Sequence, residues 1–171
     1  MIFIFLILTV IAFIIGSVPF GLLIARLKWV DLRKTGSGNI GATNVLRAVG
    51  KVPALLTLAG DILKGMIAVA LGGYFLDNLL MKGIVGLAAI AGQNFSLFLG
   101  FKGGKGVANS IGVLILFAPK AALITLALWL GVALMTRYSS LGAIVSFGLL
   151  PLNIYLFDYT KEKLIIYVII A

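Results

Sequence analysis

Three short segments of this sequence hold most of the residues that could bind an anion. They span residues 36–47, 101–108 and 137–141, and are called here the first, second and third polar segments. Because glycine has no Cβ atom, successive backbone amides of a glycine-rich loop can converge on an anion. A helix that begins just after such a loop adds its positive end. The segments therefore predict a binding site for phosphate groups.

Lys105, Lys102 and Arg47 supply full positive charges to this predicted site. Lys105 lies between two glycines at the entry of a helix, so it is the residue expected to contact a reacting phosphate. Lys102 follows an aromatic residue, where anchoring at the membrane interface explains it adequately. The remaining expected donors of hydrogen bonds or charge are Ser37, Asn39, Thr43, Asn44, Ser140 and Arg137, together with the amides of Gly36, Gly38, Gly41, Gly103, Gly104 and Gly106.

Two familiar nucleotide motifs do not account for these glycines. Gly36, Gly38 and Gly41 form a formal GxGxxG pattern, but the dinucleotide fingerprint needs a preceding strand and a βαβ unit. The Gly-Lys pair at Lys105 lacks the following Ser or Thr of a P-loop. Tight turns with positive-inside lysines are the alternative, and that interpretation is favoured for the third segment alone. The first two segments are too dense in polar residues for it beside a membrane.

The composition indicates that most of the chain is solvated by lipid. The chain has 171 residues, of which 62% are hydrophobic and 11% charged, against about 25% charged in a typical soluble domain. There is no histidine and no cysteine, which excludes a Ser–His–Asp triad and metal sites built on those residues. This length fits a single membrane-embedded domain over 1–171.

The apolar runs predict an all-α, polytopic membrane bundle of about seven helices. The run at 106–118 is short, so its helix must include flanking polar residues or be shielded by protein. The last run, which begins near residue 164, is too short to span. The full set of runs is 2–27, 53–76, 83–99, 106–118, 120–136, 140–157 and the one that begins near 164.

The loop charges predict the orientation. The first, third and fifth loops carry nine basic residues, and the opposite side carries four. Basic loops stay in the cytoplasm, which places the N-terminus outside and all three polar segments on the cytoplasmic face of the membrane. The same logic explains the net charge of +9 without nucleic acid. The nine are Arg26, Lys28, Arg33, Lys34, Arg47, Lys51, Lys102, Lys105 and Arg137, and the four are Lys82, Lys120, Lys161 and Lys163.

Asp61 and Lys64 lie three residues apart within the second apolar run, a spacing that places them on one helix face. Ionisable residues inside a membrane span are candidates for a functional site. An internal salt bridge that makes the helix insertable explains them equally well. We therefore expect a supporting intramembrane pair, with both interpretations open.

At these residues the sequence resembles the bacterial acyl-phosphate:glycerol-3-phosphate acyltransferases, the PlsY family. The resemblance covers nearly the whole chain. Three long motifs in the right order are far more specific than one glycine pattern. The matching stretches are 16–21, 36–44, 61–65, 101–108 and 137–141.

The resemblance implies a seven-helix bundle that transfers a fatty acyl group from acyl phosphate to the 1-hydroxyl of glycerol 3-phosphate, giving lysophosphatidate. It implies no metal or cofactor, and contact with membrane lipid and with the soluble enzyme that produces acyl phosphate. The positions expected to hold the phosphates and the reacting groups are Ser37, Asn39, Arg47, Lys105 and Ser140.

The sequence departs from the family pattern at two places. Gln93 and Ser96 stand where the family usually has a histidine and a proline. The family usually continues into a basic tail with His and Asn, whereas this sequence stops at Ala171. We predict that Gln93 is structural and bonds to loop groups near 102–106.

A transporter or channel for an organic phosphate or another anion is the alternative function, because broken helices and glycines also serve that role. The polar segments argue against it, since they share one side and leave no basic relay to the other face.

Overall fold

The computed structural model describes residues 1–157 and 160–170, and within them every regular element is helical. This confirms the predicted all-α class. The elements are α1 (Ile2–Ser17), α2 (Phe20–Arg26), α3 (Ala42–Ala48), α4 (Lys51–Phe75), α5 (Leu79–Asn94), the 3₁₀ turn η1 (Leu97–Leu99), α6 (Val107–Phe117), α7 (Pro119–Thr136), α8 (Ser139–Gly148), α9 (Leu150–Phe157) and α10 (Lys161–Ile170).

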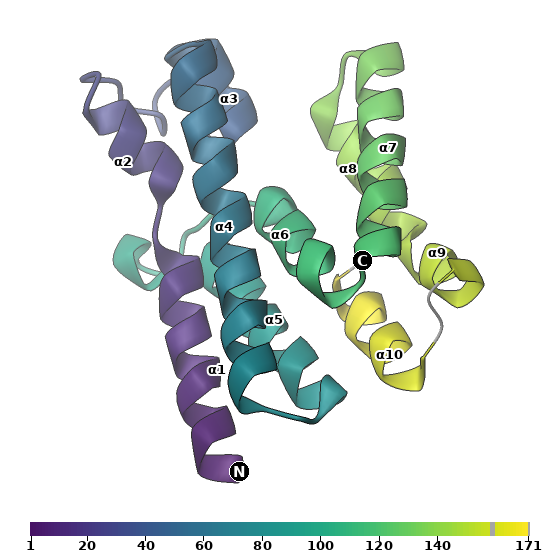
Figure 1. Ribbon diagram of the computed structural model, residues 1–171. Coiled ribbons are helices and arrows are strands. Elements are labelled where there is room, and N and C mark those ends of the chain that lie inside the picture. Colours follow the sequence, from purple (N-terminus) through teal and green to yellow (C-terminus); the bar gives the residue numbers. More distant parts are fainter. Residues whose placement is uncertain (158–159, 171) are drawn as a thin grey trace.

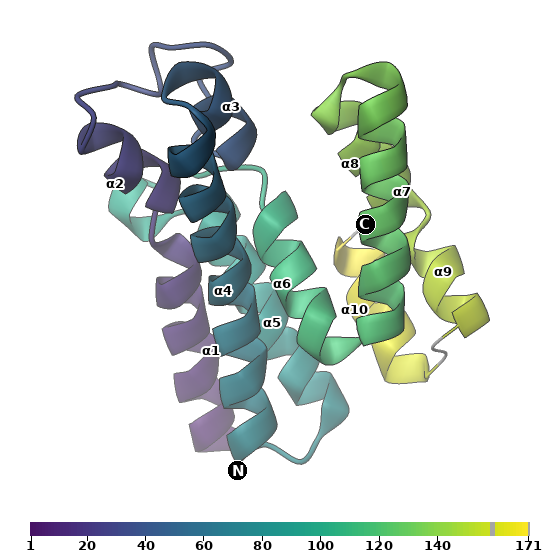
Figure 2. The ribbon, with the colours of Figure 1, turned by 45° about the horizontal axis from the view of Figure 1, so that its top comes forward.

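Two groups of helices stand beside each other (Figures 1 and 2). In the first, α1 packs on α5, and α4 packs on both α5 and α6. In the second, α7 pairs with α8, and α9 and α10 close its lower end in Figure 1. Both views show α3 and the α7–α8 turn at the end of the molecule opposite the N-terminus.

Four helical stretches in the described residues are long and apolar enough to cross a membrane, and a fifth is formed if α8 and α9, bent by 45°, count as one. Each predicted apolar run contains helix, although several are interrupted. The run at 83–99 becomes α5, which starts earlier at Leu79, followed by η1. The last run becomes α10, which starts at Lys161. The four stretches are Ile2–Arg26, Lys51–Phe75, Leu79–Leu99 and Pro119–Thr136.

The first span is interrupted between α1 and α2. Val18 is extended, with φ −61° and ψ 117°, and Pro19 follows it. Proline disfavours the helical conformation for the preceding residue and has no N–H to continue the hydrogen-bond ladder. The prediction of one unbroken run over 2–27 therefore missed a break that the Val18-Pro19 dipeptide indicates.

Close backbone contacts hold the first group of helices together. A Cβ atom on Gly92 would lie 2.1 Å from the carbonyl oxygen of Phe13, and one on Gly112 would lie 2.0 Å from that of Ile62. Only glycine permits these approaches of α1 to α5 and of α4 to α6. Small residues at helix contacts are how membrane helices pack without a hydrophobic driving force between them.

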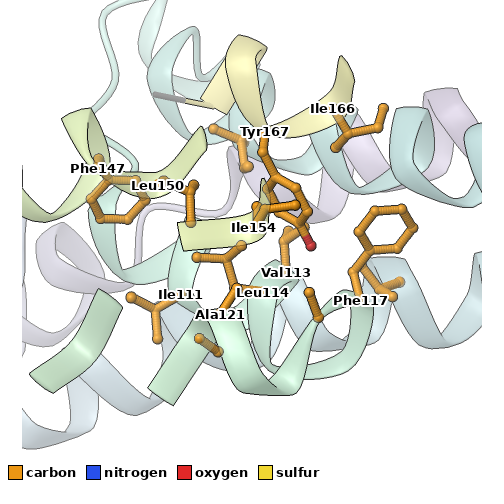
Figure 3. Packing of buried hydrophobic residues seen from close by; sticks show 14 residues of the cluster. Ile111, Val113, Leu114, Phe117, Ala121, Phe147, Leu150, Ile154, Ile166 and Tyr167 are labelled. Carbon is orange, nitrogen blue, oxygen red and sulfur yellow. The ribbon is translucent and has the colours of Figure 1, made fainter. Parts of the chain in front are cut away.

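The short helix α6 is the centre of the largest apolar core (Figure 3). Val113 and Leu114 are fully buried, and they face Leu150 and Ile154 of α9 and Tyr167 of α10. The sequence predicted that this short helix would either include flanking polar residues or be shielded by protein. Because α6 begins at Val107 and is largely buried, the second alternative is confirmed.

Candidate active site

A cavity of about 730 Å³ opens between the two groups of helices, and residues from all three polar segments line it. The predicted convergence of these segments on one end is therefore confirmed. Of the predicted site residues, the lining includes Ser37, Asn39, Gly41, Thr43, Asn44, Arg47, Lys105, Gly106, Ser140 and Asp61. Those outside it are Gly36, Gly38, Lys102, Gly103, Gly104, Arg137 and Lys64.

Asn44 organises the first polar segment. Its side-chain nitrogen lies 2.8–3.2 Å from the carbonyl oxygens of Leu32, Thr35 and Asn39, and its oxygen accepts from the Ser37 amide at 3.0 Å. Asn44 is 2% exposed, so its amide is used inside the loop. Asn44 was predicted to bind phosphate. In the structure its side chain instead shapes the loop that carries Ser37 and Asn39.

The second polar segment is fixed against the end of α5. The Gly103 amide donates to the carbonyl of Asn94 at 3.0 Å, and the Gly104 amide donates to that of Gln93 at 2.9 Å. These two amides are therefore not available to a phosphate here, although the sequence predicted that they are. The residues at the start of α6, which follows Gly106, line the cavity instead.

Three cationic side chains line the cavity: Lys105, Arg47 and Lys51. All three are exposed, and in the part of the chain that the structure describes none of them forms an ion pair. Lys102 lies outside the cavity, where its carbonyl accepts from the Arg33 guanidinium. Arg137 also lies outside, as the left-handed C-cap of α7.

The third polar segment closes the cavity from the second group of helices. The Ser139 hydroxyl lies 3.3 Å from that of Thr43, which joins α8 to α3. The indole nitrogen of Trp129 donates to the Ser139 carbonyl at 3.2 Å. Ser140 lines the cavity beside them. Taken alone, the sequence of this segment favoured an ordinary turn. Its place at the cavity was predicted only because the other two polar segments lie on the same side of the membrane.

Beyond its polar end, the cavity continues as an apolar groove. The walls come from α4 and α6 on one side and from α7 and α8 on the other, and include Leu55, Leu58, Ile62, Ile111, Leu126, Ala143, Ile144 and Phe147. Several of these are exposed in the absence of lipid, among them Leu55 at 65% and Ile144 at 71%. The groove can therefore accept an apolar chain next to the bilayer.

Asp61 and Lys64 form a buried ion pair at 2.9 Å, with the carboxylate toward the cavity and the ammonium behind it. The Lys64 ammonium also donates to the side-chain oxygen of Gln93. The prediction that Gln93 bonds to the loop is therefore confirmed only for its backbone carbonyl, which accepts from Gly104.

Several lining residues were missed by the sequence analysis. The sequence analysis treated Lys51 only as a basic residue of a cytoplasmic loop, although it lies in the same loop as the predicted site residue Arg47. Ser139 adjoins the predicted Ser140. Gln93 was predicted to be structural, but its place in the cavity lining was not predicted. The apolar groove has no sequence signal of its own, because its walls come from four helices.

We expect Gln93→His to change turnover less than about tenfold, or about 1.4 kcal/mol. A neutral imidazole nitrogen can accept from Lys64 as the amide oxygen does. Turnover of the purified variant and of the parent chain, measured side by side, checks this. A rise far above tenfold would show that this chain lacks a catalytic group that histidine supplies.

The fold and the cavity together define an integral membrane protein in which cationic side chains, hydroxyls and the start of a helix line one cavity beside an apolar groove. The family profile described as Glycerol-3-phosphate acyltransferase matches residues 6–171. The chain belongs to this glycerol-3-phosphate acyltransferase family, as the resemblance predicted.

Individual relatives support the same assignment. The glycerol-3-phosphate acyltransferase of Geobacter sulfurreducens is 50% identical over 149 residues, which cover 86% of this chain and 76% of the relative. The glycerol-3-phosphate acyltransferase of Thermus thermophilus is 53% identical over 132 residues, which cover 77% of this chain and 66% of the relative. The crystal structure of PlsY (YgiH), an integral membrane glycerol 3-phosphate acyltransferase in its glycerol 3-phosphate form, matches with a TM-score of 0.90 and 41% identity, over 97% of this chain and 84% of that one.

Proposed function

We propose that this chain transfers a fatty acyl group from acyl phosphate to the 1-hydroxyl of glycerol 3-phosphate, which gives lysophosphatidate, the first step of phospholipid synthesis. The observation that carries the proposal is the single cavity that joins a cationic polar end to an apolar groove. The two solved forms of PlsY, one with glycerol 3-phosphate and one with lysophosphatidic acid, support the acceptor and the product.

The charges of the cavity suit two anionic substrates. Two phosphate groups a few ångströms apart repel each other, and Lys105, Arg47 and Lys51 offset this repulsion. Ser37, Asn39 and Ser140 add donors without net charge. Holding both substrates in register can itself lower a bimolecular barrier by roughly 7–11 kcal/mol.

The proposed step needs no protein nucleophile, because an acyl phosphate is a mixed anhydride with a good leaving group. The 1-hydroxyl oxygen of glycerol 3-phosphate attacks the acyl carbonyl carbon and forms the ester bond. The bond between that carbon and the phosphate oxygen breaks, and a substrate phosphate oxygen accepts the hydroxyl proton. Lysophosphatidate and inorganic phosphate leave. This chemistry fits a chain without histidine and cysteine.

We further propose that the N-terminus is outside and that the cavity faces the cytoplasm of a bacterial inner membrane, because Arg47, Lys51 and Lys105 of the basic loops line the cavity. This side gives glycerol 3-phosphate direct access from water. It also allows contact with the soluble enzyme that produces acyl phosphate.

The test is to supply purified protein with acyl phosphate and labelled glycerol 3-phosphate and to measure lysophosphatidate. Omission of acyl phosphate, or its replacement by an acyl thioester, should give no product. Product from the thioester would refute the proposed donor. Movement of unchanged label across proteoliposomes, with no product, would favour the anion transporter instead.

We expect Ala143→Phe to raise KM for palmitoyl phosphate about tenfold and to leave KM for glycerol 3-phosphate nearly unchanged. Ala143 lies in the wall of the apolar groove and has no polar side-chain atom that could bind glycerol 3-phosphate, and added bulk costs about 1–3 kcal/mol where space is already filled. Steady-state kinetics with octanoyl phosphate, whose tail is shorter, provide the control. An equal rise of both KM values would contradict the assignment of the groove to the acyl chain.

A further inference from the structure

The break between α1 and α2 takes the carbonyl groups of Gly16, Ser17 and Val18 out of the regular helical ladder, and of these only that of Val18 accepts from a backbone amide, that of Phe20 at 3.2 Å. In lipid such groups must be satisfied by protein. The Lys64 ammonium donates to the carbonyl of Gly16 at 3.1 Å and to that of Val18 at 2.7 Å. The Ser96 hydroxyl donates to the carbonyl of Ser17 at 2.6 Å. Side chains from α4 and from the segment after α5 therefore stabilise the break.

Lys64 does more than neutralise Asp61. Its ammonium, on a side chain 3% exposed, is surrounded by the two carbonyl oxygens of the break, the Asp61 carboxylate and the Gln93 side-chain oxygen. These groups come from α1, the α1–α2 link, α4 and α5. An ion pair needed only for insertion of α4 would not require acceptors on the neighbouring helices.

Gln93 connects this ammonium to the second polar segment. Its side chain accepts from Lys64, and its backbone carbonyl accepts from the Gly104 amide at 2.9 Å. The side-chain nitrogen of Gln93 would also lie only 3.1 Å from a Cβ atom on Gly104. Lys105 is the next residue along the chain and lines the cavity.

We propose that Lys64 is a positioning residue, which fixes the second polar segment through Gln93 and thereby sets the place of Lys105 in the cavity. Lys64 does not line the cavity, so it acts through these contacts alone. The inference rests on the proposed acyl transfer, and the test below includes a measurement that does not depend on activity.

The decisive variant is the double substitution Asp61→Asn, Lys64→Met. Lys64→Met alone would leave a buried carboxylate without its partner, which is strongly destabilising, whereas the double variant removes both charges. We expect a lower melting temperature in detergent, because the carbonyls of Gly16 and Val18 lose their donor, but a protein that is still folded at the assay temperature. We also expect kcat at least about tenfold lower and faster hydrogen–deuterium exchange in peptides covering 95–106, measured without substrate. Parental kcat and parental exchange would show that Lys64 only neutralises Asp61, and would overturn the proposal.

Gln93→Leu tests the same connection with the ion pair intact. We expect it to lower kcat and to raise exchange in peptides covering 95–106 as the double variant does. Because both changes break one path, combining Gln93→Leu with the double variant should add little further loss. Fully additive losses would overturn the proposal. If the double variant fails to fold, parental kcat and parental exchange in Gln93→Leu would overturn it instead.

Asn153→Leu is the matched control. Asn153 is also a buried polar residue, but its amide donates to the Ala121 carbonyl and the Thr125 hydroxyl between α9 and α7. It should lower the melting temperature without faster exchange at 95–106. If Asn153→Leu accelerates exchange at 95–106 as much as the double variant does, exchange in this segment depends only on general stability, and the proposal is overturned. If the parent chain makes no lysophosphatidate, the proposed function fails while the exchange results still decide the role of Lys64.

Discussion

Lys105→Ala is expected to reduce turnover at least about a hundredfold while the protein still folds and inserts. Lys105 lines the cavity beside the start of α6, so its ammonium and the helix N-terminus can act on one phosphate. Loss of a charged contact that tightens in the transition state costs about 3–4 kcal/mol, by analogy with loss of an oxyanion donor. The measurement is kcat of folded, detergent-purified protein with saturating acyl phosphate.

Lys102→Ala is the matched control, because Lys102 has the same charge and lies three residues away. Its side chain is outside the cavity, and its interaction with Arg33 uses the backbone carbonyl, which alanine retains. We therefore expect a loss well below that of Lys105→Ala. If the two variants lose activity equally, or if Lys105→Ala keeps most of its turnover, the assignment of the phosphate-binding lysine is wrong.

Gly103→Ala is expected to lower turnover on the order of a hundredfold. A Cβ atom on Gly103 would lie 2.1 Å from the carbonyl oxygen of Gln93 and 2.6 Å from that of Asn94. Both are backbone atoms, so the segment has to move away from α5, and Lys105 moves with it. A misplacement of about 1 Å near a reacting group can cost about a hundredfold in rate. Single-turnover kinetics of the variant measure the effect on the chemical step.

Gly73→Ala provides the comparison for this substitution. Gly73 lies in α4, and no heavy atom outside its neighbouring residues and the local helix backbone lies within 4 Å of an added Cβ atom. Alanine is also favoured over glycine in a helix interior. Turnover and melting temperature should be unchanged or slightly raised. Near-parental turnover in Gly103→Ala would mean that close contact with α5 does not set the active geometry.

The helical class and the common location of the polar segments could be predicted because both depend on local composition. Long apolar runs need helices in lipid, and the alternation of basic loops placed 36–47, 101–108 and 137–141 on one side. The Val18-Pro19 dipeptide also indicates the break between α1 and α2. The prediction missed it because the run at 2–27 was identified from its apolar composition alone.

The use of individual amides could not be predicted, because it depends on contacts between distant parts of the chain. The composition of the second polar segment indicated amides free for phosphate, yet Gly103 and Gly104 donate to the end of α5. Asn44 looked like a substrate donor and instead holds its own loop together. Some polar groups of a loop form the hydrogen bonds that fix its own shape and are therefore not free to bind a ligand. The spacing of residues in the sequence does not show which polar groups these are.

The groove between α4 and α7 has a consequence for how the rate of the proposed reaction depends on concentration. Its walls include the exposed side chains of Leu58 and Leu126, so we expect an acyl donor to arrive by diffusion within the bilayer plane. The relevant quantity for that donor is then its mole fraction in the membrane or micelle. Glycerol 3-phosphate, by contrast, is governed by its bulk molarity. Added detergent should therefore slow the reaction by surface dilution of one substrate, without inhibiting the protein and without affecting the other.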